Sequence, residues 1–168
     1  MLPRILGFGL VLFGAYVVIQ EAKKTALVQQ YSDMPAPDAA VDVLARTIWG
    51  EARGEGTAGM QAVANVIMNR AANPGWWGTD IQSVCLAPWQ FSCWNPTDPN
   101  LIQLTGVDAS DPQFAVALQL AQAAVAGQLP DITGGATSYY NPSLVQPSWA
   151  SSMTVTAQIG SQVFGVVA

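Results

Sequence analysis

Residues 44–56 read Leu44-Ala-Arg-Thr-Ile-Trp-Gly-Glu51-Ala-Arg-Gly-Glu-Gly56, an apolar helical stripe that runs into a glycine-rich break. The apolar spacing predicts an amphipathic helix that begins at about Ala39 and ends at these glycines. On a helical wheel, at about 100° per residue, Glu51 falls beside Leu44 and Ile48 inside the stripe. The opposite face, which we expect to be exposed to solvent, carries Asp42, Arg46 and Arg53.

Glu51 is the first candidate for chemistry. A carboxyl group at the inner end of an apolar stripe, one turn before glycines end the helix, is expected to open into a cleft. Loss of water there favours the neutral acid, which is what a general acid acting on a glycosidic oxygen needs. The competing interpretation is a structural glutamate near a helix end, hydrogen-bonded to nearby backbone or paired with Arg53.

The composition excludes several kinds of catalyst and partner. The 168 residues include no histidine and two cysteines, which excludes Ser-His-Asp and Cys-His catalysis, His-ligated metals and a Cys₄ metal site. We therefore expect no metal and no cofactor. The net charge is −5, and beyond residue 30 the cationic side chains are Arg46, Arg53 and Arg70. Nucleic acid is excluded as a partner, because no basic stripe is available to displace counterions from phosphates.

The N-terminus carries an apolar run, Ile5–Ile19. As a helix it would be about 22 Å long, shorter than the hydrocarbon core of a bilayer, so it would span only with help from its flanks. Three interpretations stay open: an uncleaved export anchor, a cleaved signal peptide, and a segment buried in a larger assembly. We expect residues 1–24 to form a hydrophobic helical anchor and residues 25–38 to form a linker. Residues 39–168 form the globular domain.

The remaining elements are predicted from periodicity and from helix breakers. Pro35 and Pro37 should prevent a helix in the linker. Residues 58–72 predict a second helix, and residues 74–110 an ordered loop region with short helical turns. A third helix should begin at Asp111-Pro112 and run to about Ala126 before Gly127; it is apolar on nearly all sides and is expected to be the most buried element. Residues 133–142 and 153–159 predict short extended segments. The expected fold class is mostly α (α+β), with a small late β element.

Aromatic side chains in loop-like stretches form a second clue. They are Trp76, Trp77, Trp89, Phe91, Trp94, Tyr139, Tyr140 and Trp149, with amide and hydroxyl side chains between them. Sugar rings have apolar faces and polar rims, so such a set suits a saccharide groove. The alternative is that these aromatic side chains cover the core beneath long loops. We expect this for most of them and expect a minority to contact a ligand.

The two cysteines, Cys85 and Cys93, are candidates for a disulfide. An exported protein would allow them to pair, with a stabilisation of about 2.5 kcal/mol from closing so short a loop. Two reduced, buried cysteines are the alternative.

Several segments together resemble the cell-wall hydrolases typified by the spore-cortex-lytic enzyme SleB. The resemblance begins at residues 44–56 and continues with Gly59-Met-Gln-Ala-Val-Ala-Asn-Val-Ile-Met-Asn-Arg70. The later segments are Gln90-Phe91-Ser92 with Trp94, Thr133-Gly-Gly-Ala-Thr-Ser-Tyr-Tyr-Asn-Pro142 and Pro147-Ser-Trp149. Together they cover about residues 40–164, in the family's order.

This resemblance implies a lysozyme-like catalytic fold that acts on the glycan strands of peptidoglycan. It also implies that Glu51, the glutamate of the Gly-Glu-Ala-Arg motif, is the catalytic acid. The residues then expected to contact substrate are Glu55, Gln90, Phe91, Ser92, Trp94, Tyr139, Tyr140 and Asn141.

The expected reaction is that of a lytic transglycosylase, which cleaves the β-1,4 bond between MurNAc and GlcNAc with one glutamate. A hydrolytic N-acetylmuramidase is the alternative; it usually needs a second carboxylate, for which Glu55, Asp80 and Asp98 are candidates. A non-catalytic wall-binding or virion-structural module is a third hypothesis. We expect an exported protein, periplasmic or membrane-anchored and facing the cell wall, or else a phage lysin packaged in a virion. Residues 5–19 would then contact the membrane or the virion assembly.

Overall fold

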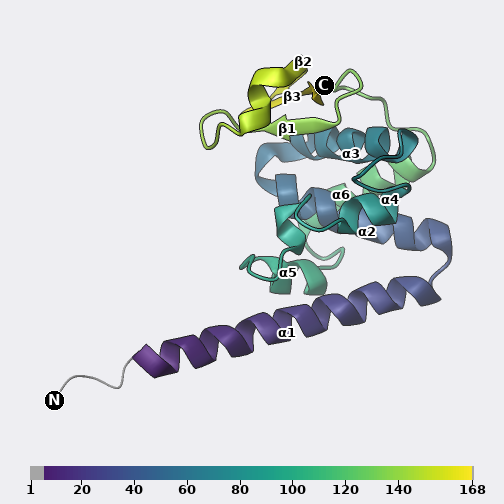
Figure 1. Ribbon diagram of the computed structural model, residues 1–168. Coiled ribbons are helices and arrows are strands. Elements are labelled where there is room, and N and C mark those ends of the chain that lie inside the picture. Colours follow the sequence, from purple (N-terminus) through teal and green to yellow (C-terminus); the bar gives the residue numbers. More distant parts are fainter. Residues whose placement is uncertain (1–5, 168) are drawn as a thin grey trace.

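The computed structural model describes the backbone of residues 6–167 and the side chains of residues 14–167 (Figure 1). Ile5 and the side chains of residues 6–13, which belong to the predicted apolar segment, lie outside this part. The helices are α1 (Leu6–Asp33), α2 (Ala36–Ala52), α3 (Gly56–Ala72), α4 (Ile81–Leu86), α5 (Leu101–Gly106) and α6 (Pro112–Val125). Short 3-10 turns are η1 (Arg53–Glu55), η2 (Ser92–Trp94) and η3 (Ser148–Ser152), and the strands are β1 (Ser138–Tyr140), β2 (Met153–Ile159) and β3 (Gln162–Val167).

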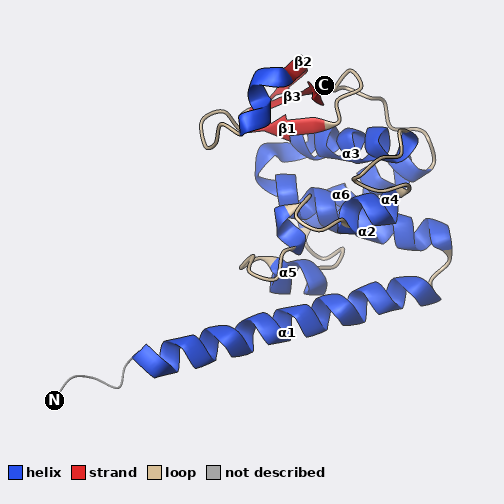
Figure 2. Ribbon diagram, viewed as in Figure 1, coloured by secondary structure: helices blue, strands red, loops and turns tan. Residues whose placement is uncertain are grey.

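The elements form layers, with α1 along one side, the other helices in the middle and the sheet on the opposite side (Figures 1 and 2). The three strands are antiparallel in the order β1-β3-β2. Phe164 on β3 is fully buried against Ala62 and Val66 of α3, so the sheet packs directly on that helix. The predicted class, mostly α with a small late sheet, is confirmed.

Helix α2 is the centre of the core. Its residues Val43, Leu44, Ala45 and Ile48 have no solvent exposure, because α1, α3, α4 and α6 surround the helix. The expectation that the helix from residue 111 is the most buried element is therefore wrong. Only one face of α6 is buried, through Phe114 and the alanines at 117, 121 and 124, and its other apolar side chains remain partly accessible.

The helix boundaries follow the signals predicted from the sequence. Helix α2 ends at Ala52, and Gly56 has a φ of 71° where the chain turns into α3. Asp111 caps α6 by accepting hydrogen bonds from the backbone N–H groups of Gln113 and Phe114, and Gly127 follows that helix with a φ of 69°. Both extended segments contain a strand, β1 and β2, whereas β3 was not predicted.

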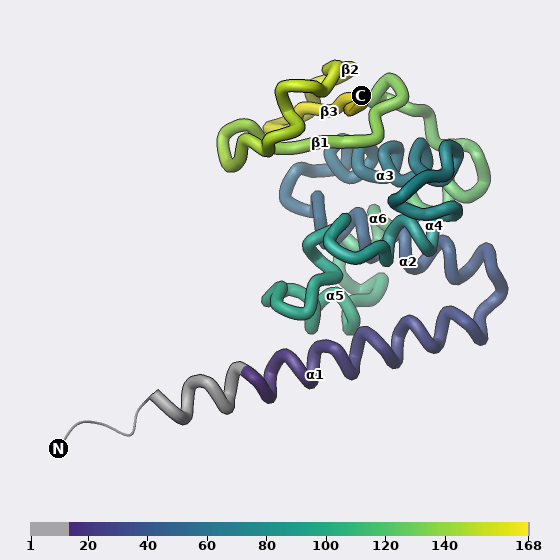
Figure 3. The backbone as a smooth tube through the Cα atoms, in the orientation of Figure 1, coloured from purple at the N-terminus to yellow at the C-terminus, as the bar shows by residue number. Residues whose placement is uncertain are grey.

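A stripe of amides on α3 positions the chain that leads into the sheet; Figure 3 shows this chain running past α3 to β1. Gln61 and Asn65 both donate to the carbonyl of Pro130, and Asn65 Oδ1 accepts from the backbone N–H of Ile132. Asn69 donates to the carbonyl of Ala136. Because these amides are four residues apart on the helix, they fix residues 130–136 along α3 and so place β1.

Helix α1 continues to Asp33, so residues 25–33 are helical and the prediction of a non-helical linker over residues 25–38 is wrong. The break is limited to Met34 and Pro35, and Pro37 lies in the first turn of α2, where a missing backbone N–H costs no hydrogen bond. The two prolines thus start the second helix and do not disrupt the first.

A polar stripe attaches α1 to the segment between η2 and α5. Tyr16 donates to the carbonyl of Pro99, and Lys24 Nζ donates to the carbonyl of Trp94 at 2.8 Å. Gln20 is fully buried, donates to the carbonyl of Pro96 and accepts from the backbone N–H of Ile102. Because these side chains are four residues apart, they share one face of α1, and α1 is an integral part of the packed structure.

The predicted solvent face of α2 is covered. Arg46 forms a 2.7 Å ion pair with Asp42 and also donates to the carbonyls of Leu104 and Val107. Tyr31 of α1 donates to Asp42 from the other side. The prediction failed because α1 and the chain around α5 pack over this face, which a single helical wheel cannot indicate.

Within residues 6–167, no helix has both the length and the apolar character needed to cross a bilayer.

The attachment of α1 predicts that Gln20 contributes to stability. Replacing it by leucine leaves a carbonyl and a backbone N–H without partners in a partly buried contact, so Gln20→Leu should lower the free energy of unfolding by about 1–3 kcal/mol. Gln29→Leu, on an exposed position of the same helix, is the matched control and should change it by less than about 0.5 kcal/mol. Urea denaturation of the full chain measures both; equal effects would contradict the attachment.

Candidate active site

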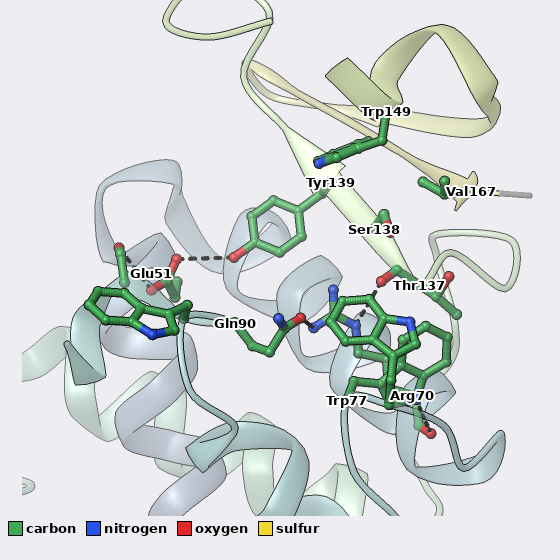
Figure 4. A pocket seen from close by; sticks show the side chains of 12 residues that line it. Glu51, Arg70, Trp77, Gln90, Thr137, Ser138, Tyr139, Trp149 and Val167 are labelled. Atoms are coloured by element: carbon green, nitrogen blue, oxygen red, sulfur yellow. Dashed lines mark hydrogen bonds between the residues drawn. The ribbon is translucent and has the colours of Figure 1, made fainter. Parts of the chain in front are cut away.

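A cleft of about 690 Å³ lies between the sheet and the loops that follow α3 and α4. Twelve residues line it, among them four tryptophans, one carboxylate and one guanidinium (Figure 4). The full set is Glu51, Arg70, Trp76, Trp77, Trp89, Gln90, Ser92, Thr137, Ser138, Tyr139, Trp149 and Val167.

Glu51 lies in the last turn of α2, half-buried, and accepts three hydrogen bonds. Its Oε1 accepts from the backbone N–H of Cys93 at 2.9 Å and from the Ser92 hydroxyl at 3.2 Å. Its Oε2 accepts from the Tyr139 hydroxyl at 3.1 Å. The donors come from η2 and β1, so both oxygens of the carboxylate are held from separate parts of the chain.

The glycine before Glu51 allows this arrangement. A Cβ atom on Gly50 would lie 2.6 Å from Cβ of Cys93 and 2.9 Å from its Sγ, closer than real side chains approach. With hydrogen in that place, η2 packs directly on α2 and the Cys93 N–H reaches the carboxylate. Arg53 does not pair with Glu51: it donates to the carbonyl of Gly50 and to Asn100 and lies over the Trp49 ring.

Tyr139 keeps its hydroxyl proton and can donate it in a hydrogen bond to Glu51. Burial and the nearby charge of Glu51 raise the pKa of Tyr139 well above its usual value. The phenol therefore stays protonated near neutral pH and donates to the carboxylate. Its ring stacks on Phe164 with centroids 5.5 Å apart, which fixes the direction of the hydroxyl.

Arg70, at the end of α3, joins three segments of the cleft wall. Its Nε donates to the carbonyl of Thr137 at 2.7 Å and its Nη1 to Oε1 of Gln90 at 3.3 Å. The guanidinium also lies over the rings of Trp77 and Phe91, 5.7 and 5.4 Å from their centroids. Burial lowers the pKa of Arg70, but an arginine remains charged in proteins.

Two tryptophans in the cleft are unusually exposed. Trp76 and Trp89 are 77% and 73% accessible, although tryptophan usually buries most of its surface. Trp89 also has a φ of 63°, the one positive φ of a non-glycine residue within residues 6–167. Residues held in sparsely populated backbone conformations are concentrated at active sites and ligand-binding sites, where the surrounding structure maintains them. Both rings are available as platforms for a ligand with apolar faces.

Four of the residues predicted to act on or contact substrate line the cleft: Glu51, Gln90, Ser92 and Tyr139. The other five do not line it. Phe91 and Trp94 are 1% and 2% accessible and belong to the core, where Trp94 donates to Thr47. Tyr140 packs edge-on against Trp149, Asn141 donates to Ser161, and Glu55 accepts from Ser161.

The sequence interpretation missed Arg70, Thr137, Ser138 and Val167. A signal for Arg70 was present, because position 70 continues the inner stripe of α3 formed by Val63 and Ile67, where a charged side chain is unexpected. The other three line the cleft through the geometry of the sheet, which local sequence does not encode.

The candidate second carboxylates have other partners. Asp80 caps α4, and Asp98 accepts from the backbone and side chain of Asn100. In the described part of the chain, Glu51 is the only carboxylate that lines the cleft. No cluster of three or more potential metal ligands occurs among the same residues.

The structure does not contain the disulfide that was one of the two interpretations of the cysteines. Cys85 and Cys93 are both free and buried. They approach α2 at different positions, since Cys85 lies near Thr47 and Cys93 packs against Gly50.

Comparison with known proteins gives consistent results. The family described as Cell Wall Hydrolase matches residues 54–165, which include every residue of the cleft except Glu51 and Val167. A spore cortex-lytic enzyme of Halalkalibacterium halodurans is 30% identical over 141 residues, or 83% of this chain. The match spans 39% of that enzyme's length.

Two solved structures share the fold. They are the catalytic domain of the germination-specific lytic transglycosylase SleB from Bacillus anthracis and the catalytic domain of the Bacillus cereus SleB protein. Each is 25% identical to this chain, covers 76% of it and has a TM-score of 0.57. The match includes 93% of the first structure and 89% of the second.

The buried thiols predict slow reaction in the folded protein. Burial raises the pKa of Cys85 to about 12, and burial together with the charge of Glu51 raises the pKa of Cys93. The reactive thiolate is therefore scarce at pH 8, and a thiol reagent should label the native chain slowly. After unfolding without reductant, both thiols should react at once. Failure to label the unfolded, unreduced protein would show a disulfide instead.

Proposed function

The chain belongs to the cell wall hydrolase family, and we propose that it cleaves peptidoglycan glycan strands as a lytic transglycosylase with Glu51 as its general acid and base. The observation that carries this proposal is Glu51, the one carboxylate among the described residues that line the cleft, held by three donors beside exposed tryptophans. One of the two structural neighbours, the SleB catalytic domain of Bacillus anthracis, belongs to a lytic transglycosylase, and this supports the proposal.

In the first step, the protonated Glu51 gives its proton to the oxygen of the β-1,4 bond between MurNAc and GlcNAc, and the bond to C1 of MurNAc breaks. The donors from Ser92, Cys93 and Tyr139 stabilise the carboxylate that remains, because hydrogen bonds to a charged form favour it. In the second step the carboxylate accepts the proton of the muramyl C6 hydroxyl as its oxygen attacks C1. A 1,6-anhydro ring forms, Glu51 is protonated again and no water is consumed.

The same geometry argues against simple hydrolysis. Glycosidases that use water usually place a second carboxylate about 5–5.5 Å or 6.5–9.5 Å from the first, to act as a nucleophile or as a base. Within residues 14–167, no second carboxylate lies in the cleft wall beside Glu51. Glu55 is hydrogen-bonded to Ser161 in the turn between β2 and β3. When the C6 hydroxyl of the substrate itself attacks C1, no second carboxylate is needed.

We also propose that the protein acts outside the cytoplasm, because its substrate lies there. Val18 and Ile19 on α1 are 68% and 51% accessible, so the end of the apolar run offers an apolar surface to a membrane or to a larger assembly such as a virion. Retention of the full chain in the membrane fraction would support the membrane location, and its presence in purified virions would support the virion location.

Glu51→Gln should abolish most of the activity. The amide keeps the shape and accepts hydrogen bonds through its oxygen, but it cannot supply a proton; general acid–base catalysis is typically worth about 10²–10⁴-fold, and here one group serves both steps. Release of soluble fragments from purified sacculi measures the rate. Glu55→Gln is the matched control and should retain most activity. Near wild-type release by Glu51→Gln would refute the assignment.

The products distinguish the two enzyme hypotheses. Mass spectrometry of fragments released by the wild-type chain should show 1,6-anhydro-muramyl ends, one water lighter than the products of hydrolysis. Reducing muramyl ends would refute the transglycosylase hypothesis and support the muramidase hypothesis. Binding to sacculi with no release of fragments would favour the non-catalytic module.

A further inference from the structure

Arg70 carries a charge at the cleft that no carboxylate of the described chain neutralises. The one ion pair within residues 14–167 joins Arg46 to Asp42. Arg70 is 7% accessible, and its Nε and Nη1 donate to a carbonyl and an amide, both neutral groups. Burying a guanidinium without a counterion is unfavourable, so a position of this kind needs a reason beyond packing.

Part of the guanidinium remains available. Nε and Nη1 make the hydrogen bonds to Thr137 and Gln90, whereas Nη2 makes no hydrogen bond with any described residue. Arg70 lines the cleft and Nη2 is not fully buried, so a ligand in the cleft can reach this third nitrogen. Figure 4 shows Arg70 and Gln90 meeting between Glu51 and Trp77.

The bond to Arg70 also fixes the amide of Gln90. An arginine donates and never accepts, so the oxygen Oε1 of Gln90 must face it, and Nε2 must point away. Within the described residues Nε2 has no acceptor, and Gln90 lines the same cleft. Two adjacent groups of the wall thus offer N–H donors without protein partners.

We propose that Arg70 Nη2 and Gln90 Nε2 form a binding site for an oxygen acceptor, a carbonyl or a carboxylate, borne by a sugar of the glycan strand. The proposal rests on the proposed function and names a feature of the substrate that the cleft recognises. Two substituents of peptidoglycan carry such an oxygen: the acetamido group on every sugar, and the lactyl group on each muramyl sugar, free or bearing a peptide. An arginine suits this task because its planar donors pair with carbonyl and carboxylate oxygens.

Gln90→Glu tests the site with little disturbance of the fold. The new carboxylate still accepts from Arg70, but it neutralises the guanidinium and removes the Nε2 donor. Gln119→Glu, on an exposed position of α6, adds the same charge away from the cleft and is the matched control. Both changes are made in full-length Glu51→Gln protein, so that binding is measured without cleavage. Urea denaturation checks the fold; should Gln90→Glu prove unstable, Gln90→Met, which also removes Nε2, replaces it.

Three soluble ligands separate the sources of the oxygen: oligomers of N-acetylglucosamine, glycan strands with the peptides removed by an amidase, and strands with peptides attached. We expect at least tenfold weaker binding of Gln90→Glu. A loss with all three ligands assigns the acetamido carbonyl, and a loss only with the two muramyl ligands assigns the lactyl group; both support the site.

Unchanged binding of all three ligands by Gln90→Glu refutes the site, as does an equal loss in Gln119→Glu, which would reflect charge alone. If the Glu51→Gln protein binds none of the ligands, the proposed function fails and the site fails with it. Binding by the Glu51→Gln protein that Gln90→Glu does not weaken leaves the proposed function in place and overturns only this inference.

Discussion

The hydrogen bonds to Glu51 are the constraint on which the rest of the architecture depends. One carboxylate at the end of α2 accepts from Ser92 and Cys93 of η2 and from Tyr139 of β1, which lie 41 to 88 residues further along the chain. A donor placed even an ångström away would be lost, since hydrogen bonds weaken steeply with distance and angle. Three elements must therefore keep a fixed relation to one another.

Each of these elements has its own means of support. Gly50 lets η2 lie directly on α2, and α1 holds the end of η2 through Lys24 and the chain after it through Gln20. The amide stripe of α3 fixes residues 130–136, and Arg70 holds the carbonyl of Thr137 two residues before Tyr139. The polar contacts to backbone carbonyls thus act on loops, where repeating secondary structure cannot determine position.

Periodicity and capping signals predicted most helices, because these depend on residues close in sequence. The wheel placed Glu51 on the inner face of α2, at the end that opens into the cleft, from spacing alone. It placed Arg46 in solvent, because the coverage by α1 depends on residues that are far away in sequence. The aromatic set contained five residues that line the cleft, but spacing did not separate Trp89 from the buried Trp94. Exposure is a tertiary property, and local spacing carries no signal for it.

The N-terminal helix combines two features that a hydropathy pattern does not separate. Its apolar run, taken by itself, indicates an anchor, yet Tyr16 and Gln20 at the end of that run already make polar contacts with the loop before α5. The faces differ: Val18 and Ile19 are exposed, whereas Gln20 is fully buried. One helix thus combines a polar stripe that belongs to the core with an apolar surface open to a partner. Because α1 is continuous from Leu6 to Asp33 and attached to residues 94–102, a partner bound at its apolar surface would hold the cleft at a defined distance and orientation, which a flexible linker could not do.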